Sequence, residues 1–143
     1  MPKSTLPELL KAALAARANA YAPYSKFHVG ACVKSGSGKL YTGCNCENAS
    51  YPVGLCAEAG AIAAMVAAGE REIAEILVIG GPASGEPWLE LVTPCGACRQ
   101  RIMEFGHEGT RIHAASIGES GKASVQRSFT LGELLPFSFG LGD

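Results

Sequence analysis

The chain has 143 residues, of which 48% are hydrophobic and 17% are charged, a balance that supports one domain with a sizeable core. Twelve basic and thirteen acidic residues give a formal net charge of -1. Because no block of Lys and Arg is available to neutralise a run of phosphates, long nucleic acid is excluded as the default partner. We therefore expect a single domain over residues 1–143.

The start of the chain lacks the apolar core of a signal peptide, and no stretch approaches the ~20 apolar residues of a membrane span. These features predict a soluble cytoplasmic protein without a membrane partner. In a reducing compartment, the six cysteines are expected to be thiols or metal ligands rather than disulfides.

The first half of the chain begins with helical apolar spacing, preceded by a capping box that we predict from Thr5 and Glu8. In chain order, the predicted elements are a helix over residues 6–19, a hairpin of strands 27–33 and 40–45 around a turn at 35–38, a polar loop at 47–52, and a buried Ala-rich helix over 56–68 stopped by Gly69.

The second half contains a continuous apolar run at residues 76–79, which predicts a strand covered on both faces at the centre of a sheet. The remaining predicted elements are a helix over 98–105, strands over 111–116 and 124–128, and a short helix over 131–135. Because helices alternate with strands, we expect an α/β fold, a three-layer α/β/α sandwich around a mixed sheet.

Two cysteine motifs carry the chemistry: Cys56-Ala57-Glu58, and the Pro-Cys-Gly-Ala-Cys segment that contains Cys95 and Cys98. Three thiolates around one zinc ion leave its fourth position open for water, whose pKa can then fall to about 7. Glu58 has no need to bind the metal and can move a proton between that water and a substrate nitrogen. Apolar neighbours are expected to raise the pKa of Glu58 toward the working range.

Both motifs fall where a loop enters a predicted helix, so two helix N-termini can face the thiolates. Three thiolates and one Zn²⁺ still sum to a net charge of -1, and Arg99, beside Cys98, is a candidate compensating cation. The alternatives are buried inert thiols, or a structural zinc site completed by Cys44, Cys46 or a histidine. Cys32, Cys44 and Cys46 are otherwise expected to be small core residues.

Four segments together resemble the homotetrameric, all-cysteine class of cytidine deaminase, and the likeness runs nearly end to end. They are residues 24–27 (Tyr-Ser-Lys-Phe), 43–51 (Gly-Cys-Asn-Cys-Glu-Asn-Ala-Ser-Tyr), 56–58 (Cys-Ala-Glu) and 94–100 (Pro-Cys-Gly-Ala-Cys-Arg-Gln). The resemblance implies a cytidine deaminase-like fold and hydrolysis of cytidine or 2′-deoxycytidine to uridine or deoxyuridine with release of ammonia, a step of pyrimidine salvage. It implies that Cys56, Cys95 and Cys98 hold Zn²⁺. Glu58 would be the proton shuttle that deprotonates the water, protonates N3 and later delivers a proton to the departing amine.

The resemblance also implies a substrate pocket for a small nucleoside. Phe27 would stack on the pyrimidine, Asn45 and Glu47 would bind the ribose hydroxyls, and Ala57 would line the pocket. In a homotetramer with shared pockets, Ala49 and Tyr51 would reach a neighbouring subunit. An aromatic near the C-terminus would close over the base, matched by Phe139 with Phe137 as the fallback.

The chain departs from the family pattern at three places. Ala59 stands where relatives often carry an Arg that hydrogen-bonds the zinc thiolates, Cys46 replaces a common aliphatic residue, and Pro52-Val53 alters the loop before the zinc helix. Two other functions are weighed: a deaminase of another aminopyrimidine ligand such as blasticidin S, and a noncatalytic zinc-stabilised binding module. The pair of Asn45 and Glu47 argues against the first.

Overall fold

A mixed sheet of five strands forms the middle layer of the protein in the computed structural model, which describes residues 5–142. The ends of the predicted domain, residues 1–4 and 143, lie outside the described part. The strands are β1 (Phe27–Ser35), β2 (Leu40–Cys44), β3 (Ile73–Pro82), β4 (Arg111–Ile117) and β5 (Ala123–Thr130), in the spatial order β2-β1-β3-β4-β5. The pair β3·β4 is parallel and the other three pairs are antiparallel.

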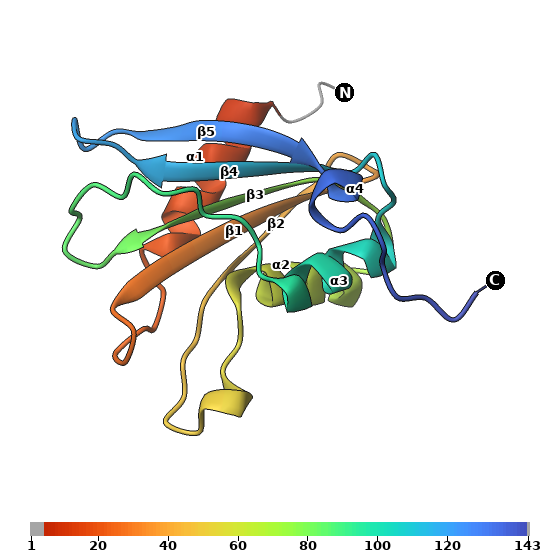
Figure 1. Ribbon diagram of the computed structural model, residues 1–143, viewed down its shortest axis with the longest axis horizontal. Helices are drawn as coiled ribbons and strands as arrows, with labels where there is room; N and C mark the ends of the chain where they lie inside the picture. Colours follow the sequence, from red (N-terminus) through yellow and green to blue (C-terminus); the bar gives the residue numbers. More distant parts are fainter. Residues whose placement is uncertain (1–4, 143) are drawn as a thin grey trace.

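Helices cover both faces of this sheet, with α1 (Leu6–Arg17) on one side and α2 (Ala57–Ala67) and α3 (Gly96–Phe105) on the other (Figure 1). The short α4 (Leu131–Leu134) follows β5, and the turn η1 (Tyr51–Val53) lies at the tip of the loop that projects from the sheet before α2. The predicted three-layer α/β/α arrangement is confirmed, as is the central position of β3. Among the described residues, no helix is both long and apolar enough to cross a membrane.

Two apolar layers hold the helices on the sheet. The layer beneath α1 contains buried residues of α1, β1, β3 and β4, namely Leu9, Ala13, Cys32, Leu77, Ile79 and Ala115. The layer on the other face is larger and includes Ala31, Val33, Ala57, Ala61, Ile62, Met65, Ile73, Ile76, Val78, Ile102, Ile112 and Leu131. Strand β1 contributes to both layers, so its central residues are buried on both faces rather than one.

Two local predictions change in the structure. Thr5 precedes α1 but its side chain caps no backbone N–H, and its hydroxyl instead donates to the Glu8 carboxylate at 3.4 Å. The capping box is found at α4, where Thr130 and Glu133 satisfy each other's backbone N–H groups. The loop predicted at residues 47–52 tightens into η1, with Pro52 in the first turn, where a missing N–H costs no helical hydrogen bond.

Close packing of α2 on β2 sets the position of the first cysteine motif. A Cβ at Gly43 would lie 2.4 Å from the Ala57 carbonyl oxygen and 2.5 Å from the Ala61 nitrogen. Only glycine allows the strand backbone to approach the helix this closely. The start of α2 is therefore held directly against the sheet, where a cavity opens beside it.

Candidate metal centre and substrate cavity

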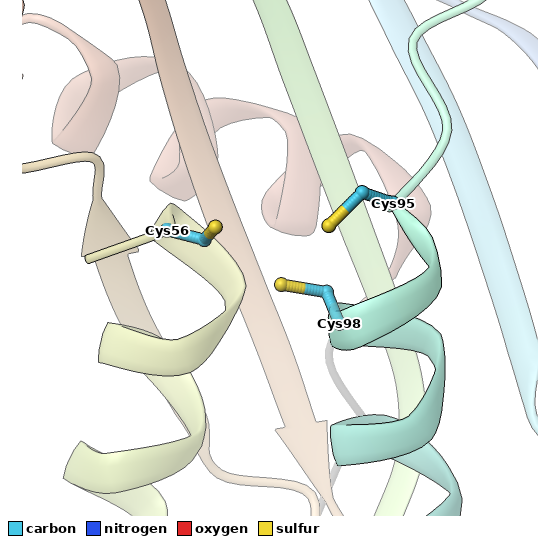
Figure 2. Close-up of side chains that lie close together, drawn as sticks. All are labelled: Cys56, Cys95 and Cys98. Carbon is cyan, nitrogen blue, oxygen red and sulfur yellow. The ribbon is translucent and has the colours of Figure 1, made fainter. Parts of the chain in front are cut away.

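Three cysteines from two helix starts converge at one point on the sheet. Cys56 is the N-cap residue of α2, Cys95 is the N-cap residue of α3, and Cys98 lies in the first turn of α3. Figure 2 shows their sulfur atoms directed into the space between the two helix starts, and all three Sγ atoms lie within 4.8 Å of one another. The predicted placement of both motifs at loop-to-helix junctions is confirmed.

The sulfur cluster fits a zinc ion. Tetrahedral Zn–S bonds of about 2.3 Å place bound sulfurs about 3.8 Å apart, so small side-chain rotations would close the cluster. Among the described residues, no fourth His, Cys, Asp or Glu belongs to this group. The alternative of a closed structural site completed by Cys44, Cys46 or a histidine therefore lacks its fourth ligand, and the donor set matches the open pattern of catalytic sites.

The electrostatics of the cluster favour a bound cation. Burial raises the pKa of Cys98 far above its usual range, and the nearby charges of Glu58, Cys56 and Cys95 raise it further. Burial also raises the pKa of Cys56. Deprotonating the Cys56 and Cys98 thiols therefore requires compensating positive charge, which a metal dication and the positive ends of α2 and α3 would supply together.

The arginine that contacts the cluster is Arg101, and the prediction of Arg99 is wrong. Arg99 donates to the carbonyl oxygens of Pro94 at 2.7 Å and Leu134 at 2.8 Å, and so ties α4 to the segment before α3. Arg101 Nη1 instead donates to Cys98 Sγ at 3.4 Å. Residues three apart share one face of a helix whereas adjacent residues do not, so this spacing is the signal that identifies Arg101.

Glu58 lies one residue into α2 beside the cysteines and is only 5% exposed. Its burial raises the pKa of the carboxyl above 4.5, partly opposed by hydrogen bonds from its own backbone and the Cys98 thiol and by the charge of Arg101. A carboxyl group with a raised pKa accepts a proton more readily than an ordinary glutamate and can return it to a substrate. The expected direction of the Glu58 pKa shift is thus found, and its dominant cause is desolvation.

A cavity of about 450 Å³ opens beside Cys56, Cys95 and Glu58. Phe27, at the start of β1, lines it and packs edge-on against Trp88 with 5.0 Å between ring centroids. A Cβ at Gly80 would lie 2.8 Å from the Phe27 ring, so the ring occupies space that only glycine leaves free. Ala57, Val78 and Val92 add further apolar wall, which suits a flat ring rather than a charged group.

Asn45 and Glu47 line the same cavity and also hold its rim together. The Asn45 amide accepts from the Val29 N–H and donates to the Phe27 carbonyl, both at 2.9 Å. Glu47 accepts from the backbone N–H groups of Tyr24 at 3.1 Å and Ser25 at 3.0 Å, and also from the Ser25 hydroxyl. The hydrogen bond from the Ser25 side chain is the main reason that the pKa of Glu47 is lowered, so the group stays a carboxylate.

Three of the predicted substrate contacts lie on exposed segments. Tyr51, on η1, is 74% exposed at the cavity mouth, and Ala49 precedes it on the projecting loop. Phe139 is 71% exposed and lies outside this cavity, because its backbone N–H and carbonyl are both hydrogen-bonded to the Gln100 side chain on α3. Within one chain the cavity is therefore bounded without Ala49 and Phe139.

Residues 3–114 match the family model described as the cytidine and deoxycytidylate deaminase zinc-binding region. This chain belongs to that deaminase family. Membership makes it an enzyme, and the three-cysteine cluster agrees with the zinc-binding character of the family.

Named relatives cover most of the chain. A cytidine deaminase of Mycobacterium tuberculosis is 37% identical over 128 residues, which span 90% of this chain and 84% of the relative. A cytidine deaminase of Halalkalibacterium halodurans is 36% identical over 131 residues, covering 92% of this chain and 91% of the relative. The crystal structure of cytidine deaminase from Burkholderia pseudomallei superposes with a TM-score of 0.79 at 40% identity and covers 95% of this chain and all of that one.

Proposed function

We propose that this protein hydrolyses cytidine and 2′-deoxycytidine to uridine and deoxyuridine, with release of ammonia. The observation that carries the proposal is the buried Glu58 carboxyl beside the Cys56, Cys95 and Cys98 cluster, in one cavity with an aromatic wall. Sequence relatives named cytidine deaminase, similar over most of the chain, support it. A role in pyrimidine salvage would follow from this activity, and the cytoplasmic location expected from the sequence stays a prediction.

The catalytic roles follow from the chemistry of the side chains. Cys56, Cys95 and Cys98 would hold Zn²⁺, which as a Lewis acid lowers the pKa of a coordinated water to about 7. The Glu58 carboxylate would take a proton from the attacking water and deliver it to N3 of the base. The same carboxylate would then take the proton of the hydroxyl group now on C4 and deliver it to the amine, so that the C4–N bond breaks, ammonia leaves and the C4 carbonyl of the product forms. A carboxyl group with a raised pKa suits this alternation between accepting and donating a proton.

The polar rim would select a neutral sugar. Asn45 and Glu47 have remaining hydrogen-bonding capacity after holding the backbone, because a carboxylate has about four lone-pair positions and an amide two donors. These groups would bind the ribose hydroxyls while Phe27 stacks on the pyrimidine. Since Glu47 remains ionised, it would repel a 5′-phosphate, and nucleosides are the expected substrate class.

We also propose a homotetramer with pockets shared between subunits. Tyr51 and Val53 on the projecting loop, and Phe137, Phe139 and Leu141 near the C-terminus, are large apolar side chains that remain exposed in one chain. Placing them against another subunit would bury this surface and would let Ala49, Tyr51 and Phe139 complete a neighbour's cavity.

The test is to follow ammonia release by the zinc-loaded protein with cytidine, deoxycytidine, cytidine 5′-monophosphate and blasticidin S. We expect the two nucleosides to be consumed fastest. Glu58→Gln should lower the rate by at least about 10²–10⁴-fold, the usual loss of general acid–base catalysis, without loss of zinc. The matched control, Glu119→Gln, changes an exposed carboxylate between β4 and β5 and should leave the rate unchanged. No ammonia from any compound would refute the proposal.

A further inference from the structure

The charge of the proposed metal centre is unbalanced by its own ligands. Three thiolates and one Zn²⁺ sum to a net charge of -1, and the buried Glu58 carboxylate lies beside them. In a site partly removed from water, excess negative charge on the sulfurs weakens the ion as a Lewis acid. Hydrogen bonds to the ligand atoms are the usual means by which a protein corrects this.

Arg101 makes such a hydrogen bond from α3. Its Nη1 donates to Cys98 Sγ at 3.4 Å, one helical turn along the same face. An arginine guanidinium is always protonated in proteins, so this hydrogen bond brings a full positive charge to the sulfur. Because the Cys56 and Cys95 sulfurs lie within 4.8 Å of the Cys98 sulfur, the same charge acts on the whole cluster.

Helix α2, which faces α3, has no hydrogen-bond donor side chain at position 59, where the residue is alanine. Ala59, one residue after Glu58, lies with Arg101 along a groove between α2 and α3 whose walls include Ile62 and Val66. The aliphatic stem of Arg101 can lie along these apolar side chains while its head reaches the sulfur. Arg99 is unavailable, because its guanidinium is bound to Pro94, Leu134 and Thr93.

We propose that Arg101 is a positioning residue that offsets the charge of the zinc thiolates through Cys98, performing from α3 a task for which Ala59 on α2 has no side chain. This inference rests on the proposed zinc site. The guanidinium acts on the metal through the sulfur and touches no substrate atom. By drawing electron density from Cys98, it would strengthen a bound zinc ion as a Lewis acid.

Four variants test the role of Arg101: Arg101→Ala, Arg101→Lys, the double variant Arg101→Ala with Ala59→Arg, and the control Arg71→Ala. Arg71 follows α2 and donates to the carbonyl oxygens of Val66 and Glu70, so its removal takes away an equal charge without touching a cysteine. Arg101 is itself exposed, so its truncation leaves the buried core intact. Thermal unfolding of each metal-free variant checks that the fold is retained.

The first readout is zinc affinity, measured by competition with a chromophoric chelator. We expect Arg101→Ala to bind zinc about 10–100-fold more weakly than the wild type, the usual effect of removing a hydrogen-bond partner of a metal ligand. Arg101→Lys should recover part of this loss because it keeps the charge but not the planar fork. The double variant should also recover part, since position 59 borders the same groove. Arg71→Ala should match the wild type.

The second readout is the thiolate-to-metal charge-transfer absorption of the Co²⁺-loaded proteins, which reports electron density on sulfur independently of turnover. We expect the charge-transfer band of Arg101→Ala to be shifted from that of the wild type. The band of Arg101→Lys should be shifted less, and the band of Arg71→Ala should not be shifted. Unchanged zinc affinity and an unchanged Co²⁺ spectrum in Arg101→Ala would overturn this inference while leaving the zinc site standing. Failure of the wild-type protein to bind either metal would overturn the proposed function itself, and the inference with it.

Discussion

The two faces of the central sheet carry cysteines of opposite character. On the α1 face, Cys32 is fully buried among aliphatic side chains, and that burial raises its pKa to about 11. On the opposite face, Cys56, Cys95 and Cys98 lie at helix N-termini, where the first two line a cavity and the third accepts a hydrogen bond from Arg101. The same side-chain type is thus a core filler or a metal ligand according to what surrounds its sulfur. Substitutions on each face should separate stability from chemistry.

The largest effect on zinc binding and activity is expected from Cys98→Ser, which removes one sulfur from the three-cysteine cluster. A serine hydroxyl does not ionise near neutral pH and is a far weaker zinc ligand than a thiolate, so bound zinc and ammonia release should both fall to background. Metal analysis of the purified protein and the ammonia assay measure this. Retention of full zinc content by Cys98→Ser would contradict the assignment of Cys98 as a ligand.

A large effect of another kind is expected from Leu77→Ala, on the α1 face. Leu77 is fully buried in the layer beneath α1, so the cavity left behind should lower the free energy of unfolding by about 2–5 kcal/mol. Turnover per folded molecule should stay unchanged. The control Leu89→Ala, in a side chain that is 69% exposed, should alter stability by less than about 0.5 kcal/mol in urea unfolding. Equal losses in the two variants would undermine the burial argument.

A smaller, pH-dependent effect is expected in the metal-free protein. Burial raises the folded-state pKa of Glu58, so the native protein binds that proton more tightly than the unfolded chain does. This contribution is fully present below the ordinary pKa of 4.5 and is lost as pH rises through the folded value. The stability of Glu58→Gln relative to wild type should therefore increase as pH rises above 4.5, as measured by urea unfolding across pH.

Glu70, just beyond α2, gives the opposite sign and serves as the comparison. A hydrogen bond from the Tyr41 hydroxyl is the main cause that lowers the pKa of Glu70 to about 2. Its contribution is present above 4.5 and is lost as pH falls toward 2, so Glu70→Gln should be less stable than wild type near neutral pH, with the difference closing in acid. Parallel pH profiles for the two glutamate variants would show that their environments do not differ as described.

The smallest effect is expected from Cys32→Ala. The substitution removes one sulfur from a packed layer and should cost about 1 kcal/mol of stability. Zinc content and ammonia release should equal those of the wild type, since this thiol lies on the face opposite to the cluster. A loss of bound zinc in Cys32→Ala would contradict the assignment of Cys32 as a core residue with no part in the metal site.

Much of the fold was predictable because apolar periodicity is a local signal. The strands and helices occur where the sequence pattern indicates, within a few residues at each end, and the continuous apolar run of β3 marks the centre of the sheet. Helix caps and tight turns were harder to predict from the sequence, because they depend on which side-chain oxygen meets which N–H group. Thr5 thus fails to cap α1, and the chain around Pro52 tightens into a turn.

The candidate site was predictable where its residues belong to short motifs. Cys56, Glu58, Cys95 and Cys98 were identified from spacing, and the structure brings the three sulfurs together beside the carboxyl group. Nearness in sequence misled the choice of cation, because each helical residue turns by about 100° and Arg99 therefore points away from Cys98. Counting three residues along α3 leads to Arg101 instead.

The amino-acid sequence by itself determined the donor types, the elements that carry them and the acid beside them, because these depend on residue identity and on spacing along the chain. Tertiary structure alone decided how the two cysteine motifs meet, since Gly43 lets α2 pack directly on β2 while α3 begins 39 residues further along the chain. It also decided that Arg101 donates a hydrogen bond to a cysteine sulfur, whereas Arg99 donates to backbone carbonyl oxygens. Such choices depend on which faces of packed helices meet, which the residues adjacent in sequence do not specify.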